Sequence, residues 1–183
     1  VVCEPAVNGP YCRAADSRCG CDVGRYRVDS QNRCDPCTAG TYGDEVALVG
    51  RCHLCAAGTY GTAVGANVSA GACTGCPAGR ASATPGASAL SFCGNCSKGT
   101  FAAAGGGGGS DDDGDGEGAA ACTICPRGFV AEAEGQAHCA ACLPGYFNPD
   151  DQKSAANHEA CTACAETGLP VSGPAAWFCT DCV

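Results

Sequence analysis

The feature that most constrains this sequence is a ladder of eight Cys-x-x-Cys pairs. The pairs are Cys34/Cys37, Cys52/Cys55, Cys73/Cys76, Cys93/Cys96, Cys122/Cys125, Cys139/Cys142, Cys161/Cys164 and Cys179/Cys182. Successive pairs are 17 to 22 residues apart, except for one step of 29 residues that contains an insertion. A short supersecondary unit has therefore been copied along the chain.

Units of about 20 residues cannot bury enough apolar surface to offset their chain entropy, so covalent bonds must hold them. The chain has 20 cysteines but one Trp, five Phe and no Met, which is a disulfide-scaffold composition. All of the cysteines are predicted to form disulfides, including Cys3, Cys12, Cys19 and Cys21, which precede the first pair. Each bond that closes such a loop stabilises the fold by roughly 3 kcal/mol, so we expect reduction to unfold the chain.

Cysteine usage and charge bound the location and the partners. An even number of cysteines at this density indicates an oxidising compartment, so we predict an extracellular or cell-surface location. A formal net charge of −9 argues against binding to nucleic acid or to anionic membranes. No apolar run is long enough to span a membrane. Because the sequence begins just before Cys3 and stops one residue after Cys182, we expect an interior or processed segment of a larger secreted protein.

A glycine follows the second cysteine of most pairs at a fixed offset of three residues. In the clearest units an aromatic residue comes two positions later, as in Cys37, Gly40 and Tyr42. The glycine is predicted to adopt a positive φ in a turn, and the aromatic residue to begin a short strand. The predicted fold is an elongated, small disulfide-rich repeat array of short two-stranded β pieces and loops, with almost no helix.

Two disulfide schemes remain open from the sequence. In the first, neighbouring pairs form four-cysteine modules with bonds such as Cys34–Cys52 and Cys37–Cys55, and the four amino-terminal cysteines bond among themselves. In the second, each unit closes on its neighbour with bonds such as Cys37–Cys52, which leaves two cysteines over. The even cysteine count favours the first scheme.

The first scheme divides the chain into six segments. These are an amino-terminal cysteine-rich segment at 1–33, modules at 34–72 and 73–101, a Gly/Asp-rich flexible insertion at 102–121, and modules at 122–160 and 161–183. The insertion contains Asp111, Asp113 and Asp115, which imitate the start of a calcium loop. Its twelfth position is Cys122 where an EF-hand requires Glu, so a flexible acidic loop is the favoured interpretation.

The recurring Cys-x-x-Cys-x-x-Gly-x-Tyr pattern resembles the ephrin-receptor-like cysteine-rich repeat, a relative in style of EGF-like and TNF-receptor modules. The resemblance covers about residues 19–182. It implies an extracellular protein, because such repeats occur in receptor ectodomains, adhesion proteins and large surface glycoproteins, including the mastigoneme proteins that build hairs on flagella. The motif is specific as a repeat and unspecific as to function.

Two sequons for N-glycosylation begin at Asn67 and Asn95. Asn67 is the better candidate, because Asn95 lies within a Cys-x-x-Cys pair whose disulfide can form first. The Trp177 patch, Ala175 to Phe178, is expected to pack on the terminal disulfides, with contact to a neighbouring domain or subunit as the alternative.

Histidines near cysteines raise the possibility of zinc. His53, His138 and His158 each lie within three residues of a cysteine. The unbroken ladder, the acidic charge and the sequons favour disulfides, so we expect solvated histidines, no metal and no cofactor. No nucleophile, base and orienting group can be assembled, and catalysis is not expected.

These observations predict a structural segment of a large extracellular glycoprotein. It would act as a rigid spacer or assembly element in a surface filament such as a flagellar mastigoneme. Its expected partners are other domains of the same protein, further copies in a filament and N-glycans. A ligand-binding receptor or adhesion ectodomain is the alternative, and a zinc-stabilised array is the second alternative.

Overall fold

We describe a computed structural model of the 183-residue chain. The structure describes residues 11–13, 18–28, 33–46, 48–103, 118–149, 154–164 and 174–176. For residues 11–19 it describes the backbone of the strands alone.

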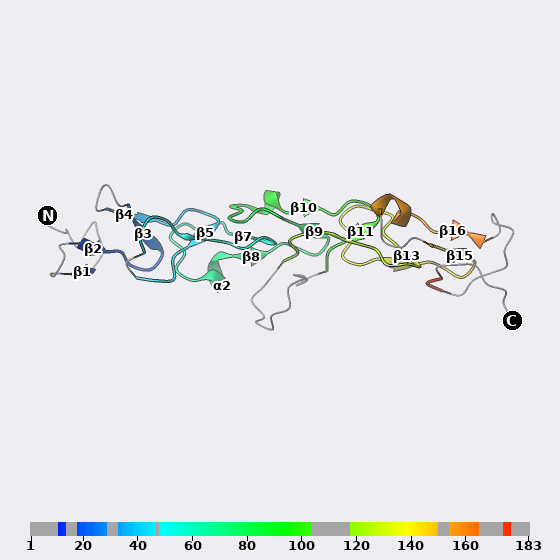
Figure 1. The fold of residues 1–183 in the computed structure, drawn as a ribbon, viewed down its shortest axis with the longest axis horizontal. Helices are drawn as coiled ribbons and strands as arrows, with labels where there is room; N and C mark the ends of the chain where they lie inside the picture. Colours follow the sequence, from blue (N-terminus) through cyan, green and yellow to red (C-terminus); the bar gives the residue numbers. More distant parts are fainter. Residues whose placement is uncertain are drawn as a thin grey trace. The chain divides into compact units, whose positions relative to one another are not determined.

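Short strands dominate the described residues (Figure 1). They are β1 (Tyr11–Arg13), β2 (Arg18–Gly20), β3 (Arg25–Val28), β4 (Arg33–Pro36), β5 (Thr41–Tyr42), β6 (His53–Leu54), β7 (Thr59–Tyr60), β8 (Thr74–Gly75), β9 (Arg80–Ala81), β10 (Gly94–Asn95), β11 (Thr100–Phe101), β12 (Thr123–Ile124), β13 (Phe129–Val130), β14 (Ala140–Ala141), β15 (Tyr146–Phe147) and β16 (Thr162–Ala163). They form eight two-stranded antiparallel sheets, each joining two strands that are consecutive in the sequence. The predicted disulfide-rich array of short β pieces is therefore confirmed.

The repeat motif sets the bounds of these strands. From β5 onward, the first strand of each hairpin starts directly after the turn glycine, and the second strand consists of the two residues between the cysteines of the next pair. In the hairpin of β7 and β8, for example, Thr59 pairs with Gly75 and Tyr60 pairs with Thr74. The aromatic residue lies in a short strand, as predicted, but it is the second residue of that strand and does not begin it.

In the part of the chain that the structure describes, helical structure is confined to single turns. These are the α-helix α2 (Ser69–Ala72) and the 3₁₀ turns η1 (Leu90–Phe92) and η2 (Ala155–His158). Among the described residues, no helix has the length and apolar character that a membrane span requires.

Seven disulfides join described cysteines and follow one rule. The second cysteine of each pair bonds to the first cysteine of the next pair, giving Cys21–Cys34, Cys37–Cys52, Cys55–Cys73, Cys76–Cys93, Cys96–Cys122, Cys125–Cys139 and Cys142–Cys161. Cys164 is also disulfide-bonded. The second scheme is thus correct for these bonds, and the favoured scheme of four-cysteine modules is wrong.

The physical reason for this pairing lies in the strand geometry. The two cysteines of a pair flank a two-residue strand, and residues three apart in extended chain point to opposite faces. One cysteine therefore bonds backward and the other forward. The amino-terminal grouping is also corrected, because Cys21 bonds to Cys34; Cys12 and Cys19 are backbone register partners, and Cys3 lies outside the described residues.

Cysteine sulfur and small side chains form the core. The cysteine three positions before each turn glycine is buried, and Cys37, Cys55 and Cys96 have no exposed surface. The residue three positions after each turn glycine from Gly40 onward is also buried, and is Gly43, Gly61, Ser82, Ala102, Ala131 or Asn148. It is mostly small because a larger side chain would meet the disulfide: a Cβ on Gly61 would lie 3.2 Å from the Cys55 sulfur.

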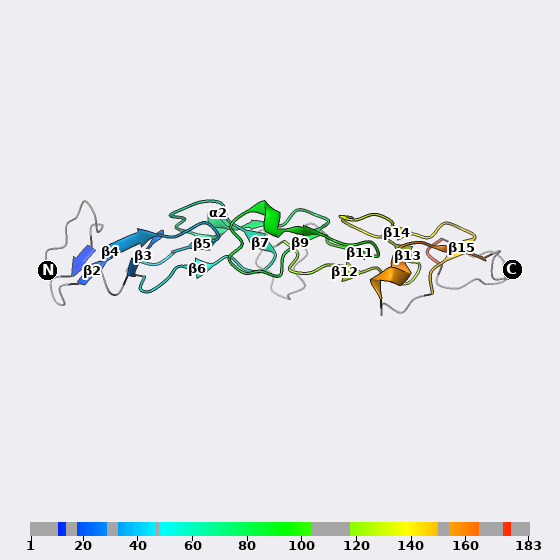
Figure 2. The same ribbon diagram turned by 90° about the horizontal axis from the view of Figure 1, so that it is seen from above.

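The chain divides into two compact units. The first holds the described residues up to Cys76 and residues 82–93, and the second holds residues 77–81, 94–103 and the described residues from 118 onward. Within each unit the hairpins follow one another in chain order (Figures 1 and 2).

A candidate functional site at the repeat junctions

The candidate site is the set of backbone contacts that joins one repeat to the next. We define a repeat as the residues from the second cysteine of a pair to the first cysteine of the next, and name it by its first residue. The carbonyl of each turn glycine accepts a hydrogen bond from the N–H of the cysteine that begins the next repeat, at 2.7 to 3.0 Å. This bond occurs seven times, from Gly24 with Cys37 through Gly145 with Cys164. Each repeat is therefore closed by its own disulfide and joined to the next repeat by a backbone hydrogen bond.

The turn glycines adopt the backbone conformation that the motif predicts. Gly24, Gly40, Gly58, Gly79, Gly99, Gly128 and Gly145 all have a positive φ, between +74° and +89°. This conformation is strained for any residue with a Cβ. The prediction for the glycine position is confirmed at all seven places.

A second recurring geometry, which the sequence analysis missed, lies in the long loop of four repeats. We call it the anchor position, and Gly65, Gly86, Gly135 and Ala175 occupy it with φ between +56° and +74°. Its N–H donates to the carbonyl of the cysteine that begins the preceding repeat, as in Gly86 to Cys55 at 2.8 Å. The loop is thereby fixed onto its neighbour.

The anchor position also contacts the repeat before that one. Its carbonyl lies against the turn glycine two repeats earlier, where any Cβ would collide: a Cβ on Gly79 would meet the Gly135 oxygen, and one on Gly128 would meet the Ala175 oxygen. Three consecutive repeats therefore meet at each such contact. The sequence signal was present, since Gly65, Gly86 and Gly135 each follow a turn glycine by seven residues.

The insertion lies in the loop of the Cys96 repeat, after the turn glycine of that repeat. In the Cys96 repeat, 19 residues separate Gly99 from Gly118, against seven in the regular repeats. The residues that flank the inserted segment pack against the rest of the repeat. Ala102 and Ala119 are buried and cluster with Cys96. Ala119 also forms a β-bridge with Ala81. The acidic run from Asp111, with its candidate calcium residues, lies outside the described residues.

The Cys142 repeat replaces the anchor glycine with η2 and a buried polar pair. His158 has no exposed surface, and its Nδ1 lies 3.3 Å from Asn148 Nδ2 and 3.2 Å from the Phe129 carbonyl oxygen. Asn148 Nδ2 also donates to the Asn157 carbonyl at 3.0 Å. The expectation that all three histidines are solvated is therefore wrong for His158, because its ring is enclosed beside Asn148 and the Phe129 carbonyl.

The other two histidines are surface residues, as expected. His53 is half-exposed, 3.5 Å from the Asp44 carboxylate and 5.5 Å from the Tyr42 ring, and His138 is exposed. No cluster of three metal-ligating side chains occurs within the described ranges. The fourteen cysteines paired above are bonded to one another, so none of them offers a thiolate to a metal.

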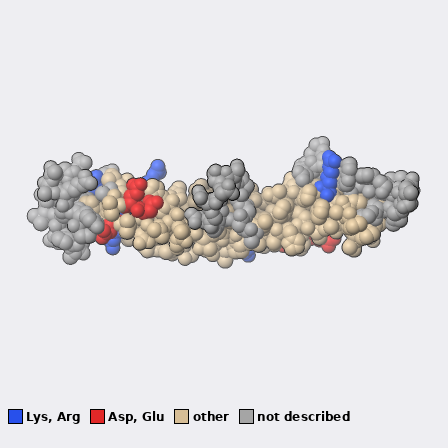
Figure 3. Space-filling view, turned by 90° about the horizontal axis from the view of Figure 1, so that it is seen from below, with Lys and Arg blue, Asp and Glu red and all other residues tan. Residues whose placement is uncertain are grey.

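Charged side chains are few among the described residues on the face that Figure 3 shows. The best-defined ion pair joins Arg33 to Asp35, with two hydrogen bonds of 2.7 Å from the guanidinium to the carboxylate. This pair lowers the pKa of Asp35 and raises that of Arg33. Both groups are solvent-exposed, so we assign the pair no large share of the stability.

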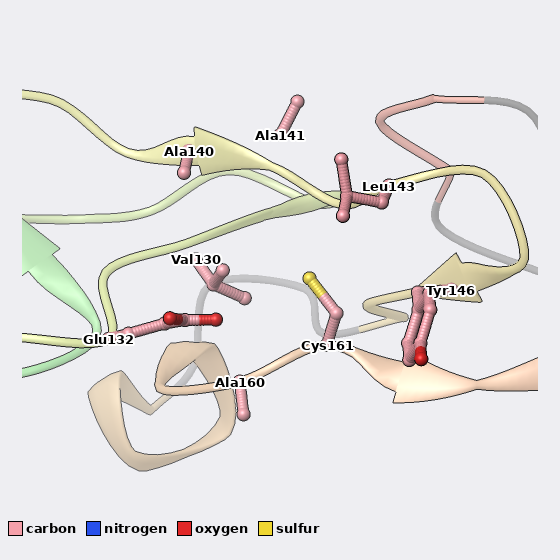
Figure 4. A pocket seen from close by; sticks show the side chains of 8 residues that line it. All are labelled: Val130, Glu132, Ala140, Ala141, Leu143, Tyr146, Ala160 and Cys161. Atoms are coloured by element: carbon pink, nitrogen blue, oxygen red, sulfur yellow. The ribbon is translucent and has the colours of Figure 1, made fainter.

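A pocket of about 410 Å³ lies in the second unit (Figure 4). The ring of Tyr146 and the carboxylate of Glu132 lie at its two ends, and Leu143 lies opposite Cys161. Leu143 is 70% exposed and Tyr146 is 43% exposed, so both side chains are open to solvent. The pocket is open and mostly apolar, and the sequence analysis did not identify it.

The remaining predicted residues are placed as follows. Asn67 and Asn95 are both exposed. Trp177 lies outside the described residues, as do Cys179 and Cys182. No family model and no curated protein sequence matches this chain.

Proposed function

We propose that this chain is a spacer or assembly segment in a surface filament, such as a flagellar mastigoneme. The disulfides alone support an extracellular structural role, because one disulfide in each of seven consecutive repeats is typical of an extracellular cysteine-rich domain. In this proposal the repeats are of the ephrin-receptor-like class and carry no catalytic activity.

The observation that supports the proposal is that each repeat is closed by a disulfide and joined to the next repeat by a backbone hydrogen bond. The Cys37 repeat, for example, is closed by the Cys37–Cys52 bond and joined to the next repeat by the bond from the Cys55 N–H to the Gly40 carbonyl. Covalent closure of each loop resists pulling and proteolysis, where a small core would not. A load applied along the chain therefore meets a covalent bond in every one of these repeats.

The test is single-molecule pulling on the chain, oxidised and reduced. The seven staples close loops of 13 to 26 residues. Together they hold back about 120 residues, or roughly 400 Å of extended chain. We expect this length to be released only in the presence of reductant; release from the oxidised chain would contradict a mechanical role.

The pocket beside Tyr146 favours a second candidate, a ligand-binding receptor or adhesion ectodomain. A receptor segment should bind a soluble partner as a monomer, whereas a filament segment should associate only with further copies or with its own neighbouring domains. Sedimentation of the isolated chain with and without candidate partners distinguishes the two. Loss of partner binding in Leu143→Ser would assign the pocket to that role.

A further inference from the structure

The two sequons lie in different structural settings. Asn67 precedes α2 in the long loop of the Cys55 repeat, and Asn95 lies in β10, between two cysteines that are both disulfide-bonded. Both asparagine side chains are exposed, so their exposure does not distinguish the two sequons. The residues around each asparagine distinguish them.

The Asn67 sequon is open to solvent at its first two residues. Val68, its middle residue, is 50% exposed and has an extended backbone, with φ −146° and ψ 148°. Ser69, its last residue, is half-buried. The neighbouring Ala66 carbonyl accepts a 3.0 Å hydrogen bond from the Gly43 N–H, so the segment is presented from a fixed base.

The Asn95 sequon is closed by the fold at its middle residue. Cys96 has no exposed surface, is bonded to Cys122, and donates its N–H to the Gly79 carbonyl at 2.9 Å. The Asn95 side chain lies along the backbone of Gly135, whose added Cβ would be 3.6 Å from the Asn95 Cγ. An enzyme that must grip three successive residues cannot reach this segment while the Cys96–Cys122 staple is closed.

We propose that the folded chain carries one N-linked oligosaccharide, on Asn67, and that the Cys96–Cys122 disulfide protects Asn95 from the same modification. The inference rests on the proposed extracellular location, because the reaction occurs in the secretory lumen. The donor is an oligosaccharide linked to a lipid diphosphate. A bond forms between Asn67 Nδ2 and the anomeric carbon of the sugar, the bond from that carbon to the diphosphate breaks, the lipid diphosphate leaves, and the amide nitrogen loses one proton.

The experiment is glycan mapping of the full chain secreted from a eukaryotic cell. Peptide-N-glycosidase in heavy-oxygen water marks each occupied asparagine by its conversion to labelled aspartate. We expect the label at Asn67 and none at Asn95. Ser69→Ala should remove one glycan from the intact mass, whereas the matched variant Ser97→Ala should leave the mass unchanged apart from the substitution.

A second pair of variants tests the protecting role of the staple. The double change Cys96→Ser with Cys122→Ser keeps the Asn-x-Ser sequence and opens the loop, so a second glycan should appear at Asn95. The control removes the Cys21–Cys34 staple, by Cys21→Ser with Cys34→Ser, and should add none. Continued absence of a glycan at Asn95 in the opened chain would overturn the protection.

Two further outcomes, both measured on the wild-type chain, show which of the two proposals fails. Labelling of both asparagines, or of neither in a chain whose cysteines resist alkylation, would overturn the inference while leaving the proposed function intact. Alkylatable cysteines throughout the chain would instead overturn the proposed extracellular function. Alkylation and glycan mapping on the same sample therefore separate the two failures.

Discussion

At the residue scale, the turn glycines allow the repeats to pack closely, a role that large apolar side chains have in an ordinary core. The turn glycine combines a positive φ with direct contact between its backbone and the carbonyl of the anchor position two repeats later. The first property is a local demand of the turn, and the second is a demand of packing. Gly50 offers a comparison, because its φ is +89° and a Cβ there would meet nothing within 4 Å.

We expect Gly79→Ala to destabilise the chain far more than Gly50→Ala. The Gly50 variant bears only the conformational strain, about 1 kcal/mol. The Gly79 variant adds a collision with the Gly135 carbonyl oxygen, and we expect a total of roughly 3 kcal/mol or more. Thermal unfolding of the oxidised proteins measures the difference; equal losses would mean that the three-repeat contact carries no energy.

The buried His158 provides a second residue-scale test. His158→Ala removes the ring that contacts Asn148 and the Phe129 carbonyl and leaves a cavity, so we expect a loss of roughly 2–4 kcal/mol. The matched variant His138→Ala changes an exposed ring and should alter stability by less than about 0.5 kcal/mol. Denaturant unfolding of both proteins gives the values. A neutral His158 variant would show that η2 holds its place without the ring.

At the element scale, the repeat consists of a hairpin of fixed length and a loop of variable length. The distance from turn glycine to anchor position is seven residues in the regular repeats, and the inserted loop of the Cys96 repeat exceeds it by 12. Ala102 and Ala119, on either side of the insertion, are buried together with Cys96. We therefore expect the fold not to depend on the inserted sequence.

Deletion of residues 105–116 should leave the fold and the staples intact. The deletion restores the seven-residue spacing and shortens the loop closed by Cys96–Cys122 from 26 to about 14 residues. The entropic stabilisation by that disulfide should change by only about 0.5 kcal/mol. Peptide mapping of the oxidised protein should recover all seven staples, and rearranged cysteine pairs would show that the insertion directs folding.

The sequence predicted the hairpins and the turn glycines because both depend on local chemistry repeated in register. It could not decide between the disulfide schemes, because an even cysteine count fits either a closed four-cysteine module or a series with cysteines left over. The pairing follows from which strand each Cys-x-x-Cys segment joins, as in Thr59 with Gly75, and that is a tertiary fact. The burial of His158 was missed for a related reason, since its ring contacts Asn148 and the Phe129 carbonyl, which lie 10 and 29 residues away in the sequence.

At the scale of the whole molecule, disulfides within repeats and backbone contacts between neighbouring repeats take the place of a shared apolar core among the described residues. Apart from Val130, His158 and Asn148, the most deeply buried residues larger than alanine are cysteines. Each repeat contacts the next through its turn glycine, and regular repeats reach the one after that through the anchor position. Stability in such arrays is close to a sum of repeat and neighbour terms.

Reduction should therefore abolish the fold throughout the described repeats. Each of the seven staples contributes about 3 kcal/mol through the unfolded state, or roughly 20 kcal/mol together, which exceeds the net stability of about 5–15 kcal/mol of a typical domain. Hydrogen exchange should show protected amides at Cys37, Cys55 and Cys96 in the oxidised chain, because each donates to a turn-glycine carbonyl. In the reduced chain this protection should vanish. Protection that survived full reduction would mean that glycine-mediated backbone packing, and not the staples, holds the repeats together.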